Sequence, residues 1–243
     1  MTASGAAPSP ARRSVVVTGV GRAGQLGEAI ARAFGKEGAR VSIVARTAAA
    51  AAARVDALRA EGLDVHPFVA DLGEAAATVA LARDVVSAAG RVDALVNAAG
   101  GFAMSGPVGE SDPALLAQQL AINLSTAYAT TRAFLPALRA SSGAVVFIAS
   151  SSALPGARVK NASAYAIAKT GVLTLMRAVA QEERANGVRS NAVAPGAIRT
   201  RDNVAAMPPN SRFVELAAVV DAILLLCSPA AASVNGEVIE LTP

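Results

Sequence analysis

The chain has 243 residues, of which 53% are hydrophobic and 16% charged, and its 22 basic and 18 acidic residues give a formal net charge of +4. A chain this apolar is not intrinsically disordered, and its length allows one domain with a sizeable buried core. The single cysteine, Cys227, excludes an internal disulfide framework. Together with the single histidine, His66, it also excludes a metal site built from several Cys or His ligands, so no metal is expected.

Targeting and membrane signals are missing from the sequence. Residues 1–13 are small, contain prolines and end in two arginines, which predicts a flexible N-terminal tail and not a secretory signal. The most apolar stretch, Leu216 to Cys227, is too short to span a bilayer and contains Asp221. The arginines are scattered singly and not interleaved with aromatic residues, so nucleic acid is not an expected partner despite a pI of about 9.8. We expect a soluble, cytoplasmic protein with no membrane or nucleic-acid partner, in which residues 14–243 form a single domain.

Short β-branched runs alternate with longer Ala-rich amphipathic segments along the whole chain. Strands are expected at Ser14–Thr18, Val41–Ala45, Val65–Val69, Ala94–Val96, Ala144–Ile148, Arg189–Val193 and Glu237–Leu241. Helices are expected at Leu26–Glu37, Ala48–Glu61, Glu74–Ala89, Pro113–Arg139 with a bend at Pro136, Ser163–Ala185 and Val214–Cys227. Strict alternation predicts an α/β fold, a doubly wound parallel sheet of about seven strands with helices on both faces. Ligands bind such sheets outside the carboxyl ends of the strands.

A glycine-rich loop follows the first predicted strand and opens the first helix. Residues 18–27 read Thr-Gly-Val-Gly-Arg-Ala-Gly-Gln-Leu-Gly. Glycines allow the backbone to approach a pyrophosphate closely, and free N–H groups at a helix N-terminus favour an anion. The loop therefore indicates dinucleotide binding, with its contacts expected from Gly19, Gly21, Arg22, Gln25, Leu26 and Gly27.

The end of the second predicted strand bears on the choice of dinucleotide. A site selective for NAD usually offers an acid at this place, whereas this chain has Ala45 followed by Arg46. The guanidinium groups of Arg46 and Arg22 suit a 2′-phosphate, so NADP(H) is favoured over NAD(H).

Tyr165 and Lys169 lie four residues apart in a predicted helix, so their side chains share one face. We expect the ammonium to approach the phenol and to lower its pKa, which would make the phenol a proton donor or acceptor near neutral pH. The fifth predicted strand ends immediately before Ser150, Ser151 and Ser152, where a hydroxyl could bind a substrate carbonyl oxygen. Asn123 is an amide within a predicted helix; binding of a backbone carbonyl or a water, or a capping or kink role, is open.

Taken in order, these residues resemble the short-chain dehydrogenase/reductase family, which has a Rossmann-type fold of about this length. The resemblance runs from residue 14 to 240. It rests on the glycine loop, Asp71-Leu72, Asn97-Ala98-Ala99-Gly100, Asn123, the serines, Tyr165-x3-Lys169 and Pro195-Gly196-x-Ile198-x-Thr200. The resemblance implies a catalytic set of Asn123, Ser150, Tyr165 and Lys169. It also implies cofactor contacts from Asp71, Leu72, Asn97, Ala98, Ala99, Gly100, Tyr165, Lys169, Pro195, Gly196, Ile198 and Thr200.

The family pattern leaves the reactive serine open between two positions. The usual spacing of 13 residues before the tyrosine selects Ser152, whereas counting along the strand from Gly143 selects Ser150. We favour Ser150, because strand register is rigid and the loop from Pro155 to Ser163 can absorb two extra residues.

The resemblance implies an NAD(P)H-dependent oxidoreductase that reduces a ketone or aldehyde, or oxidises the alcohol, with Tyr165 as general acid/base. Three alternatives stay open: reduction of a C=N or quinonoid (pteridine-like) substrate, reduction of an enoyl substrate, or a non-catalytic dinucleotide-binding module. The first is suggested by residues 203–208 and the second by a glycine loop two residues longer than the common form. A homotetramer or homodimer formed through helices 113–139 and 163–185 is also implied, and the physiological substrate is not indicated.

Overall fold

The computed structural model describes residues 12–243. Residues 1–11, which make up most of the predicted N-terminal tail, lie outside the described residues.

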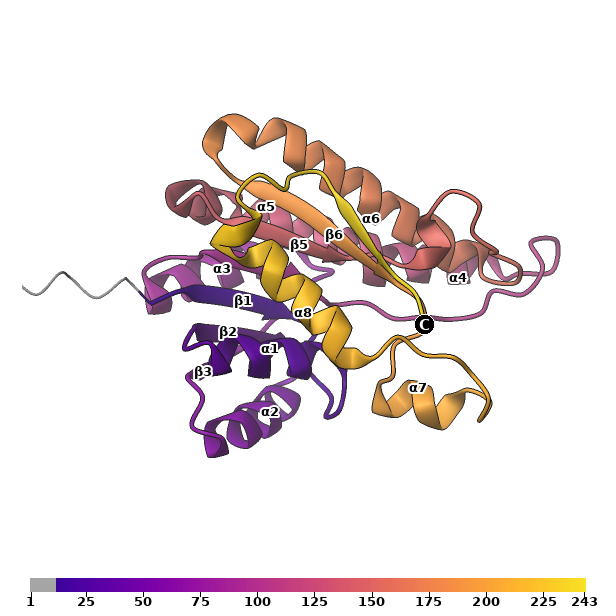
Figure 1. Cartoon of the computed structure of the whole chain (residues 1–243), viewed down its shortest axis with the longest axis horizontal. Helices are drawn as coiled ribbons and strands as arrows, with labels where there is room; N and C mark the ends of the chain where they lie inside the picture. The colour runs from indigo at the N-terminus through magenta and orange to yellow at the C-terminus, as the bar shows by residue number, and fades with distance from the viewer. Residues whose placement is uncertain (1–11) are drawn as a thin grey trace, which may run out of the picture.

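Seven parallel strands form one sheet in the order β3-β2-β1-β4-β5-β6-β7 (Figure 1). The strands are β1 (Ser14–Thr18), β2 (Arg40–Ala45), β3 (Val65–Val69), β4 (Ala94–Asn97), β5 (Ala144–Ile148), β6 (Arg189–Pro195) and β7 (Val238–Leu241). The strand order reverses direction between β1 and β4, and such a switch point opens a crevice outside the carboxyl ends of the strands. The predicted doubly wound parallel sheet is confirmed.

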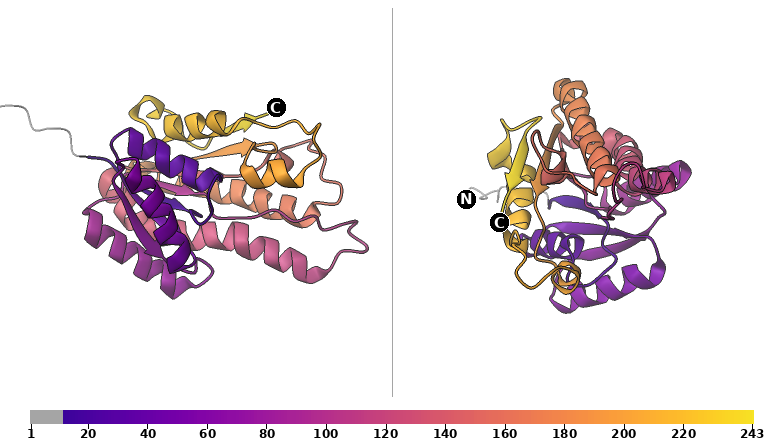
Figure 2. Two further views of the ribbon diagram at one scale, coloured as in Figure 1. Left: turned by 90° about the horizontal axis from the view of Figure 1, so that it is seen from below. Right: turned by 90° about the vertical axis from the view of Figure 1, so that its right-hand side faces the viewer.

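Helices cover both faces of the sheet (Figure 2). One face packs against α1 (Leu26–Lys36), α2 (Ala48–Ala60) and α8 (Leu216–Cys227). The other packs against α3 (Ala75–Ala89), α5 (Thr126–Ser141) and α6 (Ser163–Glu182). Because both faces are covered, the central strands are continuous apolar runs, and all five residues of β1 are buried.

The helix predicted over Pro113–Arg139 is divided into three parts. It consists of α4 (Pro113–Gln119), a π-helical segment (Leu120–Ser125) and α5, which continues through Pro136. The departure from α-helical geometry therefore lies at Leu120–Ser125, and the α-helix continues through Pro136. Such π-helical turns are often found at functional sites, and this one contains Asn123.

Other element boundaries differ from the prediction at the carboxyl side of the sheet. A short helix, α7 (Arg201–Ala206), lies between β6 and α8, where the sequence predicted no element. The helix α8 begins at Leu216 because Val214 forms a parallel bridge with Ile198. Short 3-10 turns lie at Ser151–Ala153, Arg184–Asn186 and Pro229–Ala231. Over residues 12–243, no helix combines the length and the hydropathy that a membrane span requires.

Candidate active site

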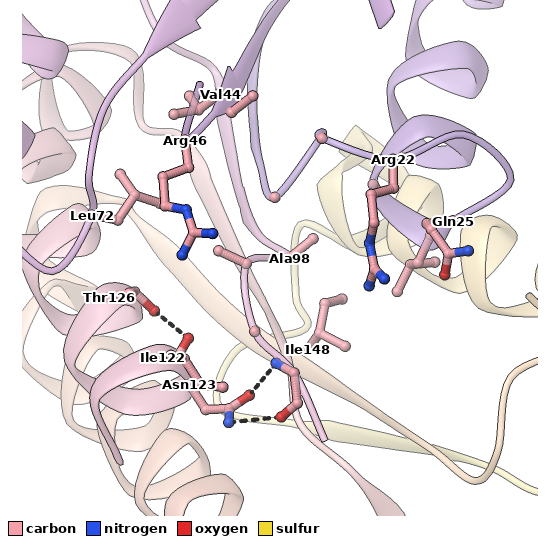
Figure 3. Close-up of a pocket in the computed structure, with 18 of the residues that line it drawn as sticks. Arg22, Gln25, Val44, Arg46, Leu72, Ala98, Ile122, Asn123, Thr126 and Ile148 are labelled. Atoms are coloured by element: carbon pink, nitrogen blue, oxygen red, sulfur yellow. Dashed lines mark hydrogen bonds between the residues drawn. The ribbon is translucent and has the colours of Figure 1, made fainter. Parts of the chain in front are cut away.

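A cavity of about 660 Å³ opens at the carboxyl ends of the strands, around the switch point between β1 and β4 (Figure 3). Most of the residues predicted to bind a cofactor line it. They are Gly19, Gly21, Arg22, Gln25, Leu26, Gly27, Arg46, Asp71, Leu72, Ala98, Ala99, Gly100, Tyr165, Lys169, Ile198 and Thr200, and Asn123 lines it with them.

The glycine loop leaves no room for side chains at two of its glycines. A Cβ atom on Gly19 would lie 2.8 Å from the backbone of Ala98 and Ala99, and one on Gly27 would lie 2.6 Å from the carbonyl oxygen of Gly19. Next to them, α1 begins at Leu26, and its N-terminal N–H groups point out of the helix toward the loop. The side-chain Nε2 of Gln25 is buried without a partner at this place. A pyrophosphate would give these donors an acceptor.

The lengthened part of the loop is held by a buried carboxylate. Glu28 in the first turn of α1 is 5% exposed, and it accepts the N–H of Gly24 and guanidinium groups of Arg32 and Arg54. Burial alone would raise the pKa of Glu28, but the hydrogen bond from Gly24 and the two arginines together lower it. The carboxylate therefore stays ionised and fixes the loop against α1 and α2.

Contacts between the glycine loop and α7 were not foreseen from the sequence. The carbonyl of Gly24 accepts the N–H of Arg201 at 3.1 Å, and a Cβ atom on Gly24 would lie 3.0 Å from the side chain of Arg201. Arg22 forms an ion pair with Asp202 at 2.6 Å. The guanidinium of Arg22 is thus engaged by α7, and Figure 3 shows it apart from Arg46 across the cavity.

The end of the cavity nearest β2 is basic. Arg46 is exposed, and in Figure 3 its guanidinium extends into the cavity beside Leu72. Asp71 lines the same cavity, and its carboxylate accepts the N–H of Gly73 at 2.9 Å. The residue at the end of β2 is Ala45, so no carboxylate faces Arg46 from this strand.

Thr18 fixes the ends of β1 and β4 to each other. Its hydroxyl accepts the N–H groups of Ala98 and Ala99, both at 3.0 Å. Asn97 does not line the cavity; its buried amide donates to the hydroxyl of Thr131 at 2.9 Å. This side chain holds the central strand against α5.

Asn123 projects from the π-helical segment toward the loop after β4. Its Nδ2 donates to the carbonyl of Gly101 at 3.0 Å and its Oδ1 accepts the N–H of Gly101 at 3.1 Å (Figure 3). A second bond runs from Nδ2 to the carbonyl of Gln119. The amide therefore fixes the loop that follows Gly100, which is a structural reason for an amide inside this helix.

Tyr165 and Lys169 face one another on α6. The Nζ of Lys169 lies 5.8 Å from the centre of the Tyr165 ring and donates to the carbonyl of Ile148 at 2.7 Å. Burial lowers the pKa of Lys169 to about 8, so at neutral pH it still carries its charge. The expected lowering of the Tyr165 pKa is wrong for this structure, because burial raises it. The phenol of Tyr165 therefore carries its proton at neutral pH.

Of the three serines after β5, Ser150 is the one whose side chain hydrogen-bonds the phenol of Tyr165. It lowers the pKa of Tyr165 through a side-chain hydrogen bond, against the larger effect of burial. Its Oγ accepts the N–H and the hydroxyl of Ser152, at 3.3 Å and 3.0 Å. Ser152 thus donates to Ser150, and the hydroxyl proton of Ser150 is left for the bond to the phenol oxygen of Tyr165.

Three other predicted residues lie at the edge of this arrangement. Pro195 ends β6 beside Leu241, and the N–H of Gly196 donates to the carbonyl of Leu241, so neither residue lines the cavity. Thr200 does line it, and its hydroxyl caps α7 by accepting the N–H of Asn203 at 3.3 Å.

Several lining residues were not predicted from the sequence. They include Phe102, Ile122, Thr126, Ile148 and Asn203. The motif Asn97-Ala98-Ala99-Gly100 follows a predicted strand, and Phe102 comes two residues after it. This position could have identified Phe102 as a lining residue. Asn203 lies on α7, for which the sequence offered no periodic signal.

A dinucleotide fits the residues present. The glycine cradle and the unpartnered Gln25 amide suit a pyrophosphate, and Arg46 and Asp71 line the β2 end of the cavity. Tyr165 and Lys169 line the same cavity.

Comparison with known proteins agrees with this geometry. Residues 13–209 match the family model described as short chain dehydrogenase. The galactitol 2-dehydrogenase (L-tagatose-forming) of Cereibacter sphaeroides is 35% identical, with 92% of this chain and 91% of that protein covered. The cis-4-hydroxycyclohexanecarboxylate dehydrogenase of Sinomonas cyclohexanicum is 33% identical, with 94% of each chain covered.

A solved structure shows the same likeness in three dimensions. A single-substitution variant of the actinorhodin polyketide ketoreductase, crystallised with NADPH, superposes with a TM-score of 0.85 at 27% identity, covering 94% of this chain and 95% of that one. Together with the family match, this means that the chain belongs to the short-chain dehydrogenase/reductase family and is an NAD(P)-dependent oxidoreductase.

Proposed function

We propose that the protein reduces a ketone or aldehyde with NADPH, or oxidises the corresponding alcohol, with Tyr165 as the general acid/base. The carrying observation is that a protonated phenol and a charged lysine line one cavity with the glycine cradle and Arg46, and that Ser150 hydrogen-bonds the phenol. The relatives named for galactitol and for cis-4-hydroxycyclohexanecarboxylate support an alcohol or ketone as substrate.

Each side chain has a definite task in this scheme. A bound reduced nicotinamide supplies the hydride. Tyr165 donates its phenolic proton to the carbonyl oxygen, and Ser150 donates a hydrogen bond to the same oxygen, which orients it. Lys169 would hold the nicotinamide ribose hydroxyls, and its ammonium places a positive charge near the phenolate that remains. Asn123 keeps the loop at Gly101 fixed beside them.

Replacing Tyr165 by Phe tests the catalytic assignment. Tyr165→Phe should lower the rate of NADPH oxidation with a carbonyl substrate by at least about 10²-fold, because the proton donor is lost. Binding of NADPH, measured by titration calorimetry, should stay within about threefold of the original protein. A variant with unchanged turnover would overturn the assignment, and turnover of pterins, quinones or enoyl thioesters alone would favour the alternative reductase chemistry.

Arg46 is the residue that we assign to the 2′-phosphate, since Arg22 is paired with Asp202. Arg46→Ala should weaken NADPH binding about tenfold or more and leave NADH binding unchanged, because a charge-assisted contact contributes about 1.5–3 kcal/mol. Arg83→Ala, an exposed arginine on α3, is the matched control. Equal affinities of the unmodified protein for NADH and NADPH would refute the NADP(H) preference.

We also infer a homodimer or homotetramer formed through α4, α5 and α6. Large apolar side chains are exposed on these helices, namely Leu116, Tyr128 and Ile167. Their burial against a second copy would remove apolar surface from water. Light scattering of the purified protein tests this, and a monomer at micromolar concentration would contradict it.

A further inference from the structure

The wall of the cavity beside Tyr165 is a phenyl ring. Phe102, on the loop after β4, meets the Tyr165 ring edge to face, with the ring centres 5.0 Å apart and the planes at 84°. This contact covers only part of Phe102, which lines the cavity and remains 61% exposed. Met104, two residues further along the loop, is 57% exposed. The loop therefore offers apolar surface next to the proton donor.

Polar side chains that line the cavity near this place are already engaged with the protein. Asn123 is bonded to both backbone groups of Gly101, and the ammonium of Lys169 to the carbonyl of Ile148. On the segment after β6, the Asn203 amide donates to the carbonyl of Ile198 at 2.8 Å. Thr200 accepts the backbone N–H of Asn203 and so caps α7.

The internal bonds of the Asn123 and Asn203 amides, and the assignment of Lys169 to the ribose hydroxyls, leave few groups for a substrate with many hydroxyls. The hydroxyls of Tyr165 and Ser150 converge on one place and suit one carbonyl oxygen. Additional substrate hydroxyls brought into the cavity would lose water without gaining partners, which weakens binding. An apolar substituent beside the carbonyl would instead gain by covering the exposed face of Phe102.

We propose that the substrate is a cyclic ketone, or its alcohol, whose carbonyl carbon is part of an apolar ring, and that Phe102 is the residue that selects it. This inference rests on the proposed function. It separates the chain from relatives that act on open-chain polyols, because Phe102 offers dispersion contacts and a flat face but no hydrogen bond.

The experiment compares two classes of substrate with NADPH as reductant. We expect kcat/KM for cyclohexanone and a methyl-substituted cyclohexanone to exceed that for the open-chain ketose L-tagatose by at least about tenfold. Phe102→Ala should raise KM for the cyclic ketones about tenfold or more and change kcat by less than about threefold, because ground-state contact is removed. Phe102→Leu keeps apolar volume and should restore most of the affinity.

A matched control lies on the same loop. Val108 is 76% exposed and does not line the cavity, so Val108→Ala should leave every KM unchanged. If ketoses are reduced faster than cyclic ketones, or if Phe102→Ala leaves the KM of cyclic ketones unchanged, the inference is refuted while the proposed function stands. If no carbonyl compound is turned over, both fail, and Tyr165→Phe then has no activity to remove.

Discussion

Lys169 is a buried charge that the fold maintains at a cost, and replacing it should stabilise the protein. The side chain is 5% exposed, and burial lowers its pKa from the usual 10.5 to about 8. At about 1.36 kcal/mol for each pKa unit, holding the ammonium charged costs about 3 kcal/mol at neutral pH. Lys169→Met keeps the aliphatic length and removes the charge.

The net gain is smaller than that cost, because the ammonium also donates to the carbonyl of Ile148 at 2.7 Å. Such a bond from a charged donor contributes about 1.5–3 kcal/mol. Lys169→Met should therefore raise the free energy of unfolding at neutral pH by about 1–2 kcal/mol and abolish turnover at the same time.

The pH dependence of the free energy of unfolding tests whether the buried charge of Lys169 causes the gain in stability. Between about pH 8 and 10.5 the unfolded chain binds a proton that the folded chain does not, so the stability of the original protein rises with pH through this range. The charge penalty is complete below pH 8 and is relieved above it. The advantage of Lys169→Met should accordingly shrink by about 2 kcal/mol between pH 7 and about pH 9.5.

Urea unfolding followed by circular dichroism at both pH values measures this difference. Lys36→Met, at an exposed lysine on α1, is the matched control and should show no pH-dependent gain. A Lys169→Met protein that is no more stable than the original at neutral pH, or whose advantage is the same at both pH values, would refute the reasoning.

Three further outcomes follow from the loop and the core. Gly27→Ala should weaken dinucleotide binding about tenfold or more in calorimetric titration, because its Cβ would lie 2.6 Å from a backbone oxygen. Gly109→Ala is the control and should leave binding unchanged, because a Cβ there would lie in open space. Glu28→Gln should lower the free energy of unfolding by about 2–3 kcal/mol at pH 7, because two arginines lose their counter-charge, whereas Glu61→Gln on the surface should cost under about 1 kcal/mol. The Glu28 contribution should vanish as the pH falls through its lowered pKa, since both states are then protonated. Burial raises the pKa of Cys227 to about 12, so a thiol reagent at pH 8 should label the folded protein far more slowly than the urea-unfolded chain; equal labelling rates would contradict this burial.

The sheet could be predicted from the sequence because its signals are local. Runs such as Ser14–Thr18 and Ala144–Ile148 are rich in apolar and β-branched residues and lie next to a glycine, and both are strands with the predicted bounds. Their parallel order followed from the alternation with helices, since each crossover fixes the next strand beside its neighbours.

The structural features that could not be predicted from the sequence depend on contacts between distant segments. The π-helical turn at Leu120–Ser125 has no compositional signal and is accompanied by the bonds that Asn123 makes to Gly101. The helix α7 has six residues, too few for a periodic pattern. The partner of Arg22 is Asp202, which lies far away in the sequence, so a guanidinium expected to meet a phosphate is found in an ion pair.

The prediction for Tyr165 and Lys169 on α6 was confirmed in part, for the same reason. The spacing of Tyr165 and Lys169 predicted that the two side chains meet, and they do. The direction of the Tyr165 pKa was wrong, because burial depends on the packed surroundings and outweighs a charge that spacing alone can place.

The peptide groups of Gly24 join two parts of the molecule that an engineer would wish to vary separately. Its N–H is bound by Glu28 and its carbonyl by Arg201, so one loop residue connects α1 to α7. Libraries that randomise residues 201–207 to widen substrate scope would also alter the coenzyme-binding loop. Productive redesign should therefore transplant residues 22–28 and 200–207 together, as one matched cassette.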